Sequence, residues 1–327
     1  MKTMLKGVSK ALCLIVLSLL LLTRNTQAQS RLEYGFTYGP SNFLGDLGGN
    51  SGKGATFLKD NMVSLTRFMT GMYVGYRPFE FVNFRLSVNV GRLEGADSLI
   101  KGNGGYEEAR KARNQHFRSP ITEAYLAAEI FPTALFEYEP EDVMHKIRPY
   151  GVIGVGVFHF NPQGQFENKD GSKTWVDLKP LRTEGQGMPQ YPNRKEYSLT
   201  QVNIPYGLGL KYFINQNLAV SFEIVNRKTF TDYIDDVSTT YIGNEDFYSY
   251  FGQNNPTAEV AIQMANKAAF ANGGNYRPFL GVGARRGTPT NNDAYYSSNI
   301  KLTIRLGRNE DYIYRKGGDV KCPIIRF

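Results

Sequence analysis

The sequence is poor in the residues that build disulfides, metal sites and membrane helices. Its 327 residues include two cysteines, three histidines and one tryptophan. One apolar run, at residues 11–22, stands out, and it is shorter than the roughly 18–20 residues that a spanning helix needs. These shortages exclude a disulfide scaffold and a helical membrane anchor, and they leave few side chains for histidine or thiol catalysis.

The N-terminus is typical of an export signal. Three lysines precede the apolar run, and the small residue Ala28 ends a segment suited to cleavage. We therefore expect residues 1–28 to be a signal peptide, residues 29–306 a barrel domain and residues 307–327 a C-terminal tail. Removal of the signal peptide would lower the formal net charge from +8 to +4, so the basic composition does not indicate nucleic-acid binding.

Cys322 is the one cysteine outside the predicted signal peptide. A single cysteine cannot form an internal disulfide, so in an exported chain it is either a free thiol or a link to another protein. Both alternatives stay open, and Cys322 is a candidate partner contact.

Apolar and polar residues alternate strictly in several segments. In residues 82–90, Phe84 and Leu86 share one face while Arg85 and Ser87 share the other, which is the signature of a strand. Eight such segments are long enough to cross a bilayer as tilted strands. They are residues 31–39, 68–79, 82–92, 119–131, 148–160, 197–213, 217–228 and 295–306.

The connections between these segments alternate in length. Residues 79–81 and 214–217 are tight turns and residues 132–147 are intermediate, whereas residues 40–67, 93–118, 161–196 and 230–294 form long polar loops. This pattern predicts an all-β fold, an eight-stranded antiparallel transmembrane β-barrel of the outer membrane, with long extracellular loops and both termini in the periplasm. A soluble sandwich also alternates, but its connections do not sort by parity.

One loop contains a helical pattern. Residues 256–271 are rich in alanine and begin with proline, so we expect a short helix in the longest loop, in or over the mouth of the barrel.

Aromatic residues near the ends of the segments predict two girdles at the depth of the lipid headgroups. These residues are Tyr34, Phe36, Tyr38, Tyr73, Tyr76, Phe79, Phe158, Phe160, Tyr206, Tyr212, Phe213, Tyr295 and Tyr296.

Strand parity places ten charged residues on the inner face of the barrel. An eight-stranded barrel has room inside only for side chains, and a buried charge must be paired. We therefore predict a salt-bridged lumen that plugs the barrel, with a narrow ion channel as the alternative. Four inward glycines, Gly154, Gly156, Gly207 and Gly209, are expected to leave room for long basic side chains. The charged set is Glu33, Arg77, Arg85, Glu123, Glu129, Lys211, Glu223, Arg227, Lys301 and Arg305.

Three acids, Asp232, Asp235 and Asp236, follow the seventh segment closely. Calcium favours such oxygen ligands, but the stretch lacks the order of an EF-hand loop. We expect a structural loop knot in which the acids bond backbone amides and nearby bases, with neither metal nor cofactor.

A second loop motif, "LRTEGQG", is too short and too far from a strand-to-helix junction to cradle phosphate. We expect its Arg182, Glu184 and Gly185 to make a fixed loop contact, with Arg182 and Glu184 pairing with the acidic stretch.

Catalysis is not expected. Histidines 116, 145 and 159 are scattered, and no Gly-x-Ser-x-Gly motif is present.

The ordered motifs "YGPSNFLGDL", "FRLSVNVGRLEG", "RPYGVIGVGVFHFNP", "LRTEGQG", "YSLTQVNIPYGLGLKY" and "RKTFTDYIDDVSTTY" span almost the whole predicted mature chain. Together they resemble the PorG-like outer-membrane barrel family of the type IX secretion system of Bacteroidetes. The pairing of "LRTEGQG" with "FTDYIDDVS" is the most specific part of this resemblance.

The resemblance implies a non-enzymatic membrane component that anchors or organises a periplasmic ring, made of a lipoprotein and its soluble partner, during protein export. In gliding relatives the same machine supports motility. The acidic turn with Glu137, Glu139, Glu141 and Asp142, beside the C-terminal tail, is a candidate docking surface. A barrel of unrelated role, a narrow pore or a small-solute binder, remains the alternative.

Overall fold

The computed structural model describes residues 31–47, 63–100, 106–136, 146–168, 170–215, 217–268 and 281–306. The predicted signal peptide, the acidic turn at residues 137–145 and the tail with Cys322 lie outside the described residues. Eight long strands form the frame of the described chain. They are β1 (Leu32–Leu44), β2 (Arg67–Phe79), β3 (Val82–Ala96), β4 (His116–Ile130), β5 (Ile147–Phe160), β8 (Thr200–Phe213), β9 (Leu218–Thr229) and β10 (Ala294–Arg305).

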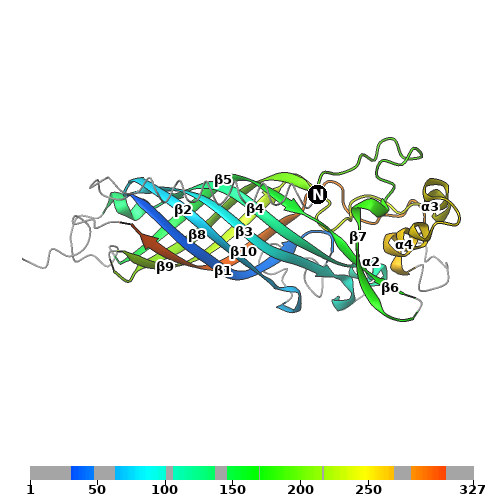
Figure 1. Ribbon diagram of the computed structural model, residues 1–327, viewed down its shortest axis with the longest axis horizontal. Helices are drawn as coiled ribbons and strands as arrows, with labels where there is room; N and C mark the ends of the chain where they lie inside the picture. Colours follow the sequence, from blue (N-terminus) through cyan, green and yellow to red (C-terminus); the bar gives the residue numbers. More distant parts are fainter. Residues whose placement is uncertain are drawn as a thin grey trace, which may run out of the picture.

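These eight strands close into an antiparallel barrel (Figure 1). Each strand pairs with its neighbour along the sheet, and the barrel closes between β3 and β4, from Val82 opposite Ile130 to Ala96 opposite His116. The register of β1 with β10 sets Glu33 opposite Arg305, so the first described strand begins where the last one ends. The predicted fold class is confirmed.

The outer wall of the barrel is apolar. Phe36 on β1 is 51% exposed, Leu208 on β8 is 74% exposed, and every strand presents similar side chains outward. So large an exposed apolar surface does not suit water and matches the lipid-facing band of a membrane barrel. Among the described residues, no helix is long and apolar enough to span a membrane.

The predicted aromatic girdles are only partly right. Seven of the rings are exposed on the outer wall, on β1, β2 and β8: Tyr34, Phe36, Tyr38, Tyr76, Phe79, Tyr206 and Tyr212. The other six are buried: Tyr73, Phe158, Phe160, Phe213, Tyr295 and Tyr296. Position near a strand end was a misleading signal. For example, Tyr73 alternates with the outward Met72 and Val74 and therefore points into the lumen.

The long loops carry structure of their own at one end of the barrel (Figure 1). The hairpin β6–β7 extends the sheet from β4, where Phe117 pairs with Gly164. The helix expected in the last loop is α4, which begins at Pro256 after the side chain of Asn255 caps the backbone amide of Thr257. The hairpin, α2 and α3 were not predicted.

The bounds of these elements are α2 (Tyr106–Arg113), β6 (Gln163–Glu167), β7 (Lys173–Asp177), α3 (Asn244–Phe251) and α4 (Pro256–Ala265). Short 3-10 segments are η3 (Val63–Leu65), η4 (Asp97–Leu99), η5 (Pro132–Leu135) and η7 (Lys179–Leu181).

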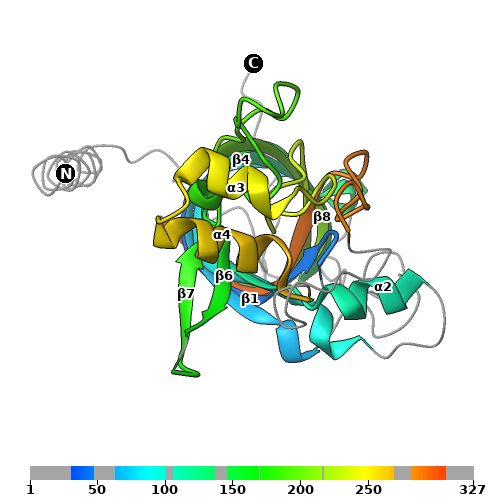
Figure 2. The same ribbon diagram turned by 90° about the vertical axis from the view of Figure 1, so that its right-hand side faces the viewer.

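The two larger apolar clusters lie at the long-loop mouth of the barrel. One cluster, which includes Phe117, Phe158 and Ile234, fills the mouth itself. A second cluster, which includes Phe247 and Met264, packs α3 and α4 against the loop after β7. The view from this end shows both helices lying across the mouth (Figure 2). The loops therefore form a packed cap.

Candidate functional site

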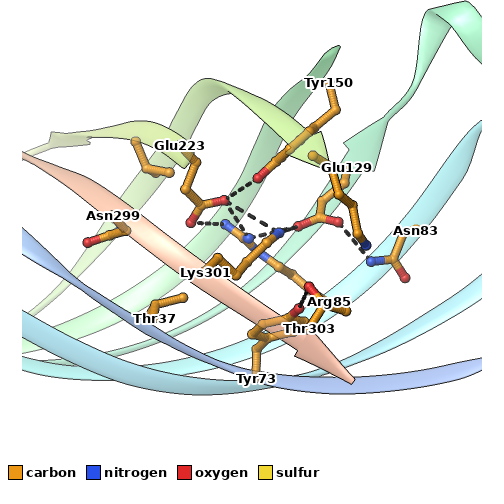
Figure 3. Close-up of polar contacts among 12 residues, drawn as sticks. Thr37, Tyr73, Asn83, Arg85, Glu129, Tyr150, Glu223, Asn299, Lys301 and Thr303 are labelled. Carbon is orange, nitrogen blue, oxygen red and sulfur yellow. Dashed lines mark hydrogen bonds and ion pairs between the residues drawn. The ribbon is translucent and has the colours of Figure 1, made fainter. Parts of the chain in front are cut away.

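At the middle of the lumen, four charged side chains from four strands form one buried group (Figure 3). Arg85 of β3 donates from Nη1 to Oε1 of Glu129 at 2.7 Å and to Oε2 of Glu223 at 2.8 Å. Lys301 of β10 pairs with Glu129 and lies 3.6 Å from Glu223. The hydroxyl of Tyr150 donates to Glu223 at 2.9 Å. None of the four charged side chains is exposed, and their two positive and two negative charges balance.

Closer to the long-loop end, Glu123 of β4 is surrounded by donors. Nη2 of Arg227 lies 2.7 Å from Oε1 of Glu123, and the hydroxyl of Tyr295 lies 2.7 Å from Oε2. Asn89 donates from Nδ2 at 2.8 Å. One acid and one base again balance.

Closer to the short-turn end, Glu33 of β1 accepts from several strands. Nζ of Lys211 lies 3.0 Å from Oε2 of Glu33, and Nε of Arg305 lies 3.6 Å from the same oxygen. Asn83 donates to Glu33 at 2.7 Å and to Glu129 at 2.8 Å, and so connects this group with the middle one.

The structure thus places all ten charged residues predicted for the inner face inside the barrel. The predicted set left out Arg148, which is 1% exposed and shares the inward face of β5 with Tyr150. The role expected for the inward glycines was wrong in part. A Cβ on Gly209 would lie 2.3 Å from Cζ of Tyr150, so this glycine makes room for an aromatic ring rather than for an arginine or lysine.

Above the lumen, contacts made by Asp46, Arg113, Glu184, Asp235, Asp236 and Arg286 tie all four long loops together. We call these six residues the loop lock.

Glu184, in the loop between β7 and β8, is the acceptor at the centre of the loop lock. Its Oε1 accepts from the backbone amide of Ser238 at 2.9 Å, and its Oε2 accepts from that of Thr239 at 2.8 Å. Nη1 of Arg286 lies 2.8 Å from Oε1. The turn that aims this carboxylate needs left-handed backbone at Gly185, whose φ is 78°.

The acids of the loop lock bond other loops. Asp235 accepts from the backbone amide of Leu47, in the loop after β1, at 2.9 Å. Asp236 accepts from the hydroxyl of Tyr197 at 2.7 Å. Arg113, at the end of α2, donates to the backbone carbonyls of Asp46 and Arg286 at 2.6 Å each.

The expected motif contacts are therefore partly present. Glu184 meets the backbone just after the acidic stretch and shares Arg286 with Asp236. The pairing expected for Arg182 was wrong, because its guanidinium bonds the carbonyl of Gln186 and the carboxylate of Glu196 instead. Sequence reasoning also missed Arg113 and Arg286, since loop residues carry no periodic pattern.

Two further carboxyls, those of Asp232 and Asp293, are buried beside the loop lock without an ion pair to a base among the described residues. Neither carboxylate oxygen of Asp232 has a hydrogen-bond partner among the described residues, and Asp293 accepts only through Oδ2, from the amide of Ile234. Burial raises the pKa of Asp232 to about 8, and the charge of Asp46 acts in the same direction. Burial likewise raises the pKa of Asp293 well above its ordinary value, as do the charges of Asp235 and Asp232.

The described part of the chain contains no candidate metal centre. There, no group of three or more histidine, cysteine, aspartate or glutamate side chains is placed to hold a metal ion. The two histidines of this part lie apart from each other, on β4 and β5. His116 contacts Glu94 at 2.9 Å and packs edge-on against Trp175. His159 is exposed and bonds Thr200, while His145 lies outside the described residues.

A closed barrel with an apolar outer wall, paired charges inside and a cap of long loops defines this chain as a transmembrane β-barrel of the outer-membrane type.

No protein-family model and no curated protein sequence matches the chain. Among solved structures it is similar to Neisserial surface protein A, at 8% identity and a TM-score of 0.35, covering 86% of this chain and 100% of that one. It is also similar to Ail, the attachment invasion locus protein of Yersinia pestis, at 8% identity and a TM-score of 0.33, covering 84% and 99%. A major outer membrane protein of Thermus thermophilus is similar at 11% identity and a TM-score of 0.33, covering 84% and 99%. The barrel assignment rests on the strand pairing itself.

The buried carboxyls make the cap sensitive to pH. Burial raises the pKa of Asp232 to about 8 and that of Asp236 to about 6. A carboxyl whose pKa is higher in the folded than in the unfolded state makes its full contribution to stability below the unfolded pKa, which is near 4. That contribution is lost as the pH rises through the folded pKa. We therefore expect the cap to lose stability between about pH 4 and pH 8.

Asp232→Asn mimics the protonated side chain, so at pH 9 this variant is expected to be more stable than the wild type by about 1–2 kcal/mol, and no more stable at pH 5. Thermal unfolding of the refolded protein between pH 5 and pH 9 measures this difference. Glu259→Gln, which neutralises an exposed acid of α4, is the matched control. A gain at pH 9 that is equal in the two variants would count against the buried carboxyls as the cause.

Proposed function

We propose that this chain is a non-enzymatic outer-membrane component of a type IX protein secretion system that anchors or organises the periplasmic ring. The observation that carries the proposal is the meeting of the two most specific resemblance motifs. Through Glu184 and Arg286, the "LRTEGQG" loop and the "FTDYIDDVS" loop share one buried group of contacts. Motifs that build one structural unit are better support for a family resemblance than motifs scattered over unrelated loops.

The lumen supports a structural role. Arg85, Arg227 and Lys301 are unexposed, and each is paired with a carboxylate, so the barrel interior is occupied by its own side chains. A filled eight-stranded barrel suits an anchor better than a conduit. Short turns face the periplasm in barrels of this type, so we infer that the start of β1 and the end of β10 lie on that side.

Deletion of the chain from its own host is expected to abolish export of the proteins that the secretion system carries, with restoration by the full chain. An affinity-tagged copy, extracted in mild detergent, is expected to retain a periplasmic lipoprotein and its soluble partner. Normal export after deletion would end the proposal, and lost export with no retained ring proteins would end the anchoring role. Planar-bilayer conductance is the control for the alternative, because a narrow pore would give discrete openings and the filled barrel none.

A further inference from the structure

The lumen charges balance in the middle and near the long loops, but not at the short-turn end. There, four bases from four strands, Arg77, Arg148, Lys211 and Arg305, point inward. Among the described residues, Glu33 and Glu80 are the acids that contact them, Glu33 through Lys211 and Arg305 and Glu80 through Arg148. We call these four bases the basic mouth. Three of them, Arg77, Lys211 and Arg305, carry two more positive charges than Glu33, the acid that pairs with Lys211 and Arg305.

Two phenyl rings, those of Phe131 and Phe213, contact the four bases of the basic mouth. The guanidinium carbons of Arg148 and Arg305 lie 5.5 Å and 4.7 Å from the ring centre of Phe213, and Nζ of Lys211 lies 5.6 Å from it. The guanidinium of Arg77 lies 4.9 Å from the ring centre of Phe131. Cation–π contacts of this kind compensate part of the cost of gathering like charges. They satisfy none of the N–H donors.

Several of those donors lack partners. Nε and Nη2 of Arg77 and Nη2 of Arg305 are buried atoms without a hydrogen bond. A buried charged donor without an acceptor is costly, and an arginine fork is the shape that receives two oxygens of a carboxylate or phosphate. Arg305 retains 12% side-chain exposure and Glu80 retains 42%, so the group opens towards water at the short-turn end.

We infer that the basic mouth is an oxyanion site, and that its ligand is a carboxylate of an acidic segment in a partner protein. The barrel wall encloses the site, so a lipid headgroup has no lateral path to it, and the ligand must enter from the aqueous compartment at the short turns. The chemistry of the site is independent of the proposed function. The identification of the carboxylate with a periplasmic ring protein rests on that function.

Binding of a fluorescein-labelled hexaglutamate peptide to the refolded barrel in detergent, followed by anisotropy, tests the site. Arg77→Gln/Arg305→Gln is expected to weaken the dissociation constant at least about tenfold, because charge-assisted hydrogen bonds are lost. Lys195→Gln/Lys228→Gln removes the same charge from exposed positions at the other end and is expected to leave binding unchanged. Heat-modifiable migration on gels verifies that each variant folds, and Arg77→Gln alone replaces the double variant if that one does not.

Equal binding by the wild type and the Arg77 variants would overturn the site. Inorganic phosphate that binds at millimolar concentration, with no peptide binding, would overturn the assignment to a protein carboxylate. Peptide binding that is seen only after Glu137, Glu139, Glu141 and Asp142 are neutralised would assign the site to the chain's own turn instead. Peptide binding as expected, together with normal export in cells carrying the Arg77 variant, would support the site and contradict its link to the proposed function.

Discussion

Replacing Arg85 by methionine is expected to lower the free energy of unfolding of the barrel by about 3–5 kcal/mol. The substitution removes a guanidinium that bonds Glu129 at 2.7 Å and Glu223 at 2.8 Å, and it leaves Lys301 as the single base of the middle group. Two unexposed carboxylates would then share one ammonium, so an uncompensated charge would remain in the interior. The lost stability reflects the cost of the unpaired buried carboxylate, and not the net stabilisation that the original ion pairs provide.

Equilibrium unfolding in urea from lipid vesicles, followed by gel migration and circular dichroism, measures this loss. Arg92→Met is the matched control, because Arg92 lies on the same strand with an exposed side chain. Adding Glu223→Gln to Arg85→Met leaves one acid and one base in the middle group, and this double variant is expected to recover part of the loss. Equal stability of the Arg85 and Arg92 variants would show that the lumen charges are not coupled as the structure has them.

The barrel strands were predictable because the membrane imposes one rule on all of them. Lipid on one side and a filled lumen on the other force a period of two, as in residues 82–90, and the tight turn at 79–81 fixes the parity of the next strand. The hairpin of β6 and β7 escapes this rule. It lies beyond the apolar wall, and its strands are short and only partly buried. The hairpin pairs with the start of β4, and no pattern in the sequence indicates that β4 extends far enough to reach it.

The lumen charges were predictable because they follow strand parity. The loop lock was not, because it depends on contacts between loops. Parity alone places Arg85 and Lys301 inside, and the same rule applied to every residue would have found Arg148 and Tyr73. The partners within the lumen follow from strand order and tilt, which the sequence does not specify. In the loop lock, Arg286 lies 102 residues from Glu184, and nothing local in either segment indicates the contact.

The second large effect is expected at Glu184, where Glu184→Gln should open the cap without unfolding the barrel. This unexposed carboxylate accepts from the amides of Ser238 and Thr239 and pairs with Arg286 at 2.8 Å. Glutamine offers an NH2 group where an acceptor is needed and leaves the Arg286 charge short of its partner, so a local loss of about 3 kcal/mol is expected. Glu196→Gln, which breaks a half-exposed ion pair in the same loop, should cost about 0.5 kcal/mol.

Native-state hydrogen exchange separates this local opening from global unfolding, because the two amides report the loops and the β9 and β10 ladder reports the barrel. The exchange of the Ser238 and Thr239 amides is expected to rise about a hundredfold in Glu184→Gln, with little change in the strand amides. A parallel rise in both sets would mean that the cap and the barrel unfold as one unit. No rise in either set would mean that Glu184 does not hold the loops, and the contact between the two motifs would then lose its value as support for the proposed function.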